Sequence, residues 1–166
     1  MAKQSIENVI NDVLKDDAKE LALGFAAYLR AKEIPVEESE SYWDIQYHGK
    51  TVCFVFINGS DEKPGPWTIW SDQEPGAWVT WADGEKMNDH IAFIVDDATK
   101  ATAWANVNFC ASCGGDCSPG KQKTILGKTF ENACSSAIAF TNPDADMVQC
   151  AIAMVEARMR DIQQRD

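Results

Sequence analysis

The sequence predicts an α+β fold: a mainly antiparallel sheet of four to six strands, packed by N-terminal, middle and C-terminal helices. Apolar residues near both ends of the chain recur at the spacing of a helix, whereas those in the middle recur at every second position. Short turn sequences join the middle segments, which favours hairpins over parallel crossovers. No linker divides the 166 residues, so we expect a single domain over 1–166.

The first thirty residues are expected to be helical. Ser5 is a suitable N-cap, and apolar residues recur at i, i+3, i+4 and i+7 from Ile6 to Leu14. A capping-box pattern at 17–20 opens a second apolar stripe. The region therefore holds either two helices or one long helix that is broken near Asp16.

Four strands are expected after an acidic loop at 37–40. The first strand alternates apolar and polar residues over 42–48, and a tight turn at His48–Gly49 leads to the apolar strand 51–57. A polar loop at 58–66 follows. The next two strands carry the pattern Pro-Gly-x-Trp-x-x-Trp, which begins at Pro64 and again, 11 residues later, at Pro75.

The second half is expected to alternate helices with short strands. A middle helix is predicted from Asp83 or Gly84 to about Thr102, followed by a Gly-, Ser- and Pro-rich loop. The segments 124–130 and 135–140 read as two short strands. A last helix is expected to begin at Asn142–Pro143, with Pro143 at the first helical position.

The charge and the ends of the chain limit the partners. A formal net charge of −11 argues against binding to nucleic acid or to an anionic membrane. The N-terminus lacks the apolar core of a signal peptide, and no run approaches the length of a membrane span. We therefore expect a cytoplasmic protein of bacterial style, in a compartment where thiols stay reduced.

Three cysteines lie close together in the segment NFCASCGGDCSPG at 108–120, and a fourth follows 17 positions after the third. This spacing, Cys-x2-Cys-x3-Cys-x16-Cys, suits a closed zinc site in a Gly-rich turn. A site with three thiolates and an open position would be a poor Lewis acid, so a structural role is favoured over catalysis. The predicted metal ligands are Cys110, Cys113, Cys117 and Cys134.

Three other interpretations of these cysteines stay open. They are an iron–sulfur cluster, a redox or sensor pair of Cys110 with Cys113 or Cys117, and free thiols without a cofactor. Cys53 and Cys150 lie in apolar segments and are expected to be small buried residues.

Six tryptophans form the second candidate site. They are either core residues or the wall of a pocket for a planar or cationic molecule, and nearby acids such as Asp44 and Asp83 would favour a cation. The ligand-pocket candidates are Trp43, Trp67, Trp70, Trp78, Trp81 and Trp104.

No pattern indicates catalysis. The chain has only two histidines, His48 and His90, and neither belongs to a recognisable triad. Lys121, Lys123 and Lys128 are expected to be solvated, with a local anion site as the alternative. We therefore expect a non-catalytic domain, stabilised by zinc, that binds a small molecule or a protein partner. A thiol-based sensor and an enzyme with a Trp-lined cleft are the alternatives.

The segment WDIQYHGKTVCF, together with the Trp-containing strands up to residue 81 and the last helix, resembles small uncharacterised bacterial α+β domains of the YdhG-like kind. The resemblance implies the fold class alone. The cysteine pattern departs from such domains, and the resemblance implies no ligand, partner or oligomeric state.

Overall fold

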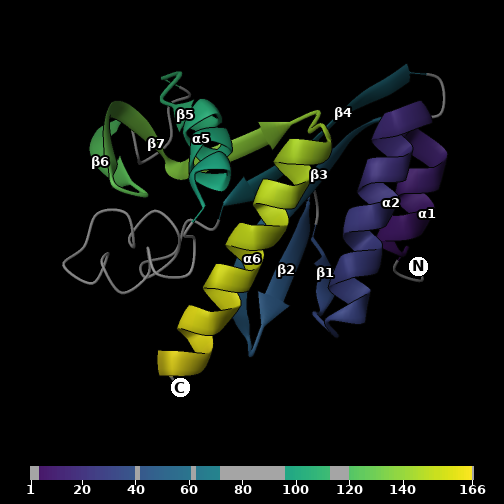
Figure 1. Cartoon of the computed structure of the whole chain (residues 1–166). Helices are drawn as coiled ribbons and strands as arrows, with labels where there is room; N and C mark the ends of the chain where they lie inside the picture. The colour runs from purple at the N-terminus through teal and green to yellow at the C-terminus, as the bar shows by residue number, and fades with distance from the viewer. Residues whose placement is uncertain (1–3, 40–41, 61–62, 72–95, 113–119, 166) are drawn as a thin grey trace.

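The computed structural model describes residues 4–39, 42–60, 63–71, 96–112 and 120–165 (Figure 1). It confirms the α+β class and the antiparallel sheet. The described residues form seven strands, more than the four to six expected. The helices are α1 (Ile6–Val13), α2 (Asp16–Ala31), α5 (Asp97–Ala105) and α6 (Ala145–Arg165). The strands are β1 (Val36–Glu38), β2 (Trp43–Tyr47), β3 (Lys50–Ser60), β4 (Lys63–Ser71), β5 (Val107–Phe109), β6 (Lys121–Ile125) and β7 (Lys128–Thr141).

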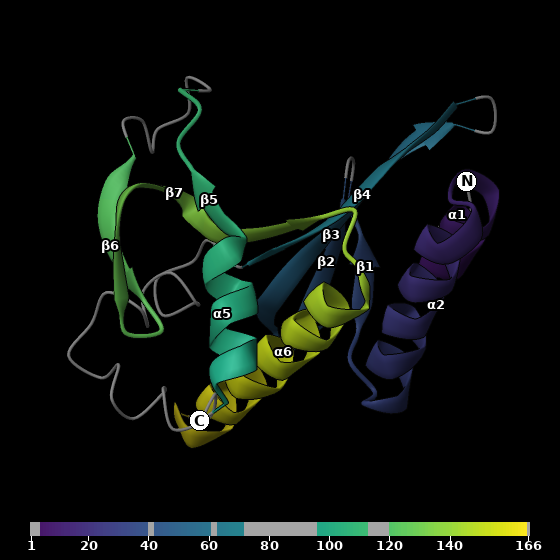
Figure 2. The same ribbon diagram turned by 45° about the horizontal axis from the view of Figure 1, so that its top comes forward.

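The sheet runs in the order β1-β2-β3-β4-β7-β5, and β6 pairs with β7 outside this path. Every pairing between described strands is antiparallel. Helix α6 crosses the sheet, with α2 along one side of it and α5 along the other (Figures 1 and 2). The apolar face of the sheet and these helices together enclose the core.

The N-terminal region forms two helices, one of the two expected arrangements. The Ser5 hydroxyl oxygen accepts a hydrogen bond from the Asn8 N–H at 3.3 Å, as its position before the first apolar stripe predicts. The second helix begins at Asp16, and its cap residue Lys15 makes no side-chain hydrogen bond. The predicted capping box at 17–20 is therefore wrong, because those residues already lie inside the first turn.

Strands β2 and β3 match the sequence-based expectation closely. Trp43 and Ile45 on β2 are buried, and His48 and Gly49 both adopt positive φ in the turn to β3. Two positive φ values are the signature of a type I′ hairpin turn. The acidic segment 37–40 departs from the expected loop, because Glu37 and Glu38 belong to β1, which pairs with β2.

The predicted polar loop at 58–66 is also wrong in part. Strand β3 continues to Ser60 and β4 starts at Lys63, and Gly59 pairs with Pro64 after a register shift. The two strands extend past the rest of the sheet as a long arm (Figure 2). Because each strand supplies hydrogen-bond partners to the other, the pairing overrides the turn preference of these residues. The second tryptophan repeat, expected to form another strand, lies outside the described residues.

The two short strands expected after the cysteines are one hairpin with a long second strand. Leu126 and Gly127 form its turn at positive φ, and β7 then continues over 14 residues. Strand β7 pairs with β6 and β5 in its first part and with β4 at its end. It therefore connects the cysteine region to the main sheet.

Both later helices begin at an aspartate cap. The Asp96 carboxylate accepts the Thr99 N–H at 2.7 Å, so the helix that contains Thr102 starts at Asp97, not at 83–84. The Asp144 carboxylate accepts the Met147 N–H at 2.9 Å, which places Pro143 before the cap of α6 and not at its first helical position.

Helix α6 is buried on a wider face than its apolar stripe predicts. Val155 and Ile162 lie in the core as expected, but Arg158 and Asp161 are also buried. The Arg158 Nη1 donates to Asp161 Oδ2 at 3.0 Å within the helix. A buried charge needs such a partner, because its desolvation is costly. None of the helices in the described ranges combines the length and apolar character needed to cross a membrane.

Candidate functional site

The cysteine-rich loop (108–120) begins and ends against the same point of β7. The Cys110 N–H donates to the Asn132 carbonyl at 2.8 Å, and Gly120 lies against both residues. A Cβ atom on Gly120 would lie 2.6 Å from the Cys110 Cβ and 2.6 Å from Asn132 Oδ1. Such distances are too short for any side chain, so the closure of the loop requires glycine at this position.

The pairing of β5 with β7 brings two of the four predicted ligands near each other. Phe109 pairs with Ala133, so Cys110 and Cys134 each follow a residue of this pair, and the register of the two strands shifts between this pair and Val107–Ile138. Both cysteines are partly buried. Cys134, 24 residues after Cys110, is therefore its neighbour in the fold.

The turn after Cys110 directs a backbone donor at its sulfur. The Ser112 N–H lies 3.4 Å from Cys110 Sγ, and Ser112 adopts a φ of 55°. An N–H group in this position is compatible with a metal-bound sulfur, whose negative charge it stabilises. Cys113 and Cys117 lie outside the described residues. In the part that the structure does describe, no three potential ligands come together.

The other two cysteines are buried, as expected. Cys53 and Cys150 are fully enclosed in the core. The Cys150 thiol donates to the Thr99 carbonyl, and burial, together with the charge of Asp96, raises its pKa to about 12. Such a thiol is a poor nucleophile and a poor metal ligand at neutral pH.

The lysines beyond the loop were expected to be solvated, and the structure confirms this for Lys121 and Lys128, which are exposed. Lys123, by contrast, is buried. The Lys128 ammonium lies 5.4 Å from the ring centroids of both Trp104 and Phe130. Lys128 therefore belongs to a cation–π cluster beside the cysteine-rich loop. The alternative of a local anion site stays a prediction.

The described tryptophan side chains lie in three different environments. Trp67 is 1% exposed and sits in the core, with no hydrogen bond to its indole N–H within the described part of the chain. The Trp104 Nε1 donates to the Ile125 carbonyl at 2.7 Å, which fixes α5 on the β6–β7 hairpin. Trp43 is 7% exposed and lines a cavity. The side chains of Trp70, Trp78 and Trp81 are outside the described part, so a shared aromatic pocket stays a prediction.

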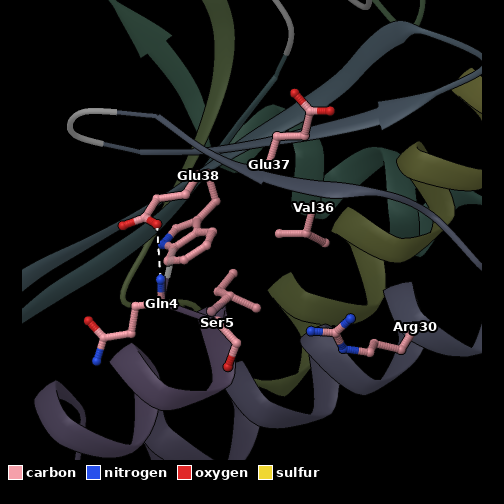
Figure 3. A pocket seen from close by; sticks show the side chains of 8 residues that line it. Gln4, Ser5, Arg30, Val36, Glu37 and Glu38 are labelled. Carbon is pink, nitrogen blue, oxygen red and sulfur yellow. Dashed lines mark hydrogen bonds between the residues drawn. The ribbon is translucent and has the colours of Figure 1, made fainter. Parts of the chain in front are cut away.

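The cavity at Trp43 has a volume of about 290 Å³, close to the lower limit for small-molecule sites (Figure 3). It lies between β1 and the adjoining ends of α1 and α2. Apolar and charged side chains contribute to its wall, and Figure 3 shows Glu37 directed away from it. Its lining residues are Gln4, Ser5, Ile6, Arg30, Val36, Glu37, Glu38 and Trp43.

Sequence reasoning missed the charged residues of this cavity. Glu38 was assigned to a loop, and Arg30 was given no role. The signal was not local, because Arg30 is held by Glu7, which lies 23 residues earlier on another helix. Only the packing of α1 against α2 brings the two side chains together.

The fold and the loop together define an antiparallel α+β domain with a cysteine-rich loop attached to its longest strand. Comparison with protein-family models found no match, and no curated protein or solved structure matched the chain either. The resemblance to YdhG-like domains therefore stays a prediction.

Proposed function

We propose that the chain is a non-catalytic cytoplasmic domain whose cysteine-rich loop is held by a structural zinc ion, and which binds a small molecule or a protein partner. The proposed ligands of the ion are Cys110, Cys113, Cys117 and Cys134. The observation that supports this proposal most strongly is the Phe109–Ala133 pair of β5 and β7, since Cys110 and Cys134 are the residues that follow its two members.

The distances across this pair suit a shared ion. Zinc binds thiolate sulfur at about 2.3 Å, so two sulfurs on one ion lie within about 4–5 Å of each other. Because Cys110 and Cys134 each follow a residue of the Phe109–Ala133 pair, we propose that rotation about χ1 brings their sulfurs to that separation. The Cys-x2-Cys-x3-Cys segment begins at Cys110, so its other two cysteines follow in the chain close to an ion bound at Cys110.

The chemistry of the ligands supports a structural role. Four thiolates complete the tetrahedral shell of zinc and leave no position for water or substrate. An ion so bound would hold the loop to β7, where Gly120 already packs against Cys110. Zinc would therefore attach the loop to β7 a second time, beside the backbone contact at Gly120.

Metal analysis of protein purified under reducing conditions tests the proposal. We expect one equivalent of zinc per chain, retained through dialysis. Brown protein with bound iron would indicate an iron–sulfur cluster in place of zinc. Metal-free protein with a disulfide between Cys110 and Cys113 would favour the thiol-based sensor. Metal-free protein with four reactive thiols would leave no cofactor site.

A further inference from the structure

The cavity beside β1 carries opposite charges on its two sides. Glu38 lies on one side, where the backbone N–H of Gln4 donates to its Oε2 at 3.2 Å. Arg30 extends from the last turn of α2 on the other side (Figure 3). A ligand inside the cavity would therefore meet a carboxylate on one side and a guanidinium on the other.

Glu7 holds the Arg30 side chain in place without using all its donors. The two oxygens of Glu7 accept from Arg30 Nε and from Nη2, the latter at 2.9 Å. These hydrogen bonds keep the Glu7 pKa near 2, so the pair is fully ionised at neutral pH. Within the described part of the chain no hydrogen bond is made by Nη1, and this nitrogen still has two N–H groups for a ligand.

The middle of the cavity is apolar. Val36 pairs with Ile45 and Glu38 with Trp43, so these four side chains share the face of the sheet that is turned toward the helices. Ile6 covers the same space from α1. A ligand between the two charges would therefore place its apolar part against Trp43 and Val36.

We propose that this cavity binds a small zwitterion, namely a free α-amino acid with a compact apolar side chain. The ammonium group pairs with Glu38, the carboxylate accepts from Arg30 Nη1, and the side chain contacts Trp43. A simple anion would meet Glu38, and a simple cation would meet Arg30, whereas a zwitterion satisfies both. The volume of about 290 Å³ suits a ligand of about ten non-hydrogen atoms.

The assignment deepens the ligand-binding half of the proposed function and is independent of the metal. We would titrate the isotopically labelled full chain with L-leucine and follow the Trp43 indole N–H and the Gln4 amide by NMR. Saturable shifts confined to the cavity are expected. The amine without the carboxylate, 3-methylbutylamine, and the acid without the amine, 4-methylpentanoate, should each bind at least about tenfold more weakly.

Substitutions separate specific recognition from the general acidity of the protein. Glu38→Gln and Arg30→Gln should each weaken leucine binding by about tenfold or more. Glu33→Gln and Lys32→Gln each remove a charge of the same sign from a nearby residue that does not line the cavity. Each should leave the affinity for leucine within about twofold of the wild-type value. Glu38→Gln keeps the volume of the side chain, and the spectrum of each variant reports its folding.

Three results would overturn the assignment. They are the absence of saturable shifts at Trp43, equal affinity for the two single-charge analogues, and equal weakening by the control variants. None of them would change the zinc content, so this assignment and the metal proposal fail separately.

Discussion

Replacement of Gly120 by alanine tests whether the cysteine-rich loop is closed as the structure shows. The added Cβ would lie 2.6 Å from two side-chain atoms and 2.7 Å from the Asn132 carbonyl carbon. A backbone atom cannot rotate away, so β7 or the loop must move. Overpacking of this kind costs about 1–3 kcal/mol. For a chain of this length, that loss lowers the melting temperature by about 2–12 °C.

Two other glycines supply matched controls, to be measured by circular dichroism in the same thermal scan. Gly24→Ala adds a methyl group in α2 with no atom within 4 Å, and should raise stability by up to about 1 kcal/mol. Gly127→Ala also meets no atom but sits at a φ of 87°, so it reports backbone strain alone, at about 1–2 kcal/mol. Wild-type stability in Gly120→Ala would refute the closure of the loop against Cys110.

Two further predictions follow from the shifted pKa values. The lowered pKa of Glu7 means that its ion pair with Arg30 stabilises the fold above the unfolded value of 4.5, and that this stabilisation is lost as pH falls toward 2. Because the pair is partly solvated, Glu7→Gln should lower the free energy of unfolding in urea by at most about 1 kcal/mol at pH 7. The difference from wild type should vanish near pH 2. A constant difference across this pH range would contradict the role of the ion pair. Cys150, with a pKa of about 12, should resist alkylation in native protein at pH 8 while metal-depleted Cys110 reacts, as mass spectrometry of digests would show; equal labelling would contradict its burial.

The parts of the fold that the sequence predicted are those specified by local patterns. Two patterns show this: the apolar stripe from Ile6 to Leu14 and the alternation from Trp43 to Tyr47. In each of them, the spacing of apolar residues reflects the side of the element that faces the core. The turn at His48–Gly49 was equally local, because glycine readily adopts the positive φ that the turn needs.

The errors arose where pairing with distant residues outweighed local preference. Gly59 and Pro64 are typical turn residues, yet they pair across the β3–β4 arm. Strand β7 appeared as two short segments because its residues face different partners along its length: Phe130 pairs with β6, whereas Phe140 pairs with β4. Register shifts in β7 break the period of two that sequence reasoning depends on.

In the candidate sites, too, local patterns were predictive and contacts between distant residues were not. Close spacing revealed Cys110, Cys113 and Cys117, but the sequence left open whether Cys134 could reach them. Whether it does depends on the register of β5 against β7, which no local pattern encodes. The sequence did not predict that Arg30 and Glu38 line one cavity with opposite charges, because the two residues come from separate elements.

The zinc content of Cys134→Ser, compared with wild type and with Cys150→Ala, tests whether Cys134 is a ligand of the ion. Cys150→Ala removes a buried thiol that is expected to have no part in metal binding, so it controls for a general loss of stability. We expect one zinc per chain in wild type and in Cys150→Ala, and loss of that zinc on dialysis in Cys134→Ser. Equal zinc in all three proteins would show that Cys134 is not a ligand and would contradict the proposed four-cysteine site.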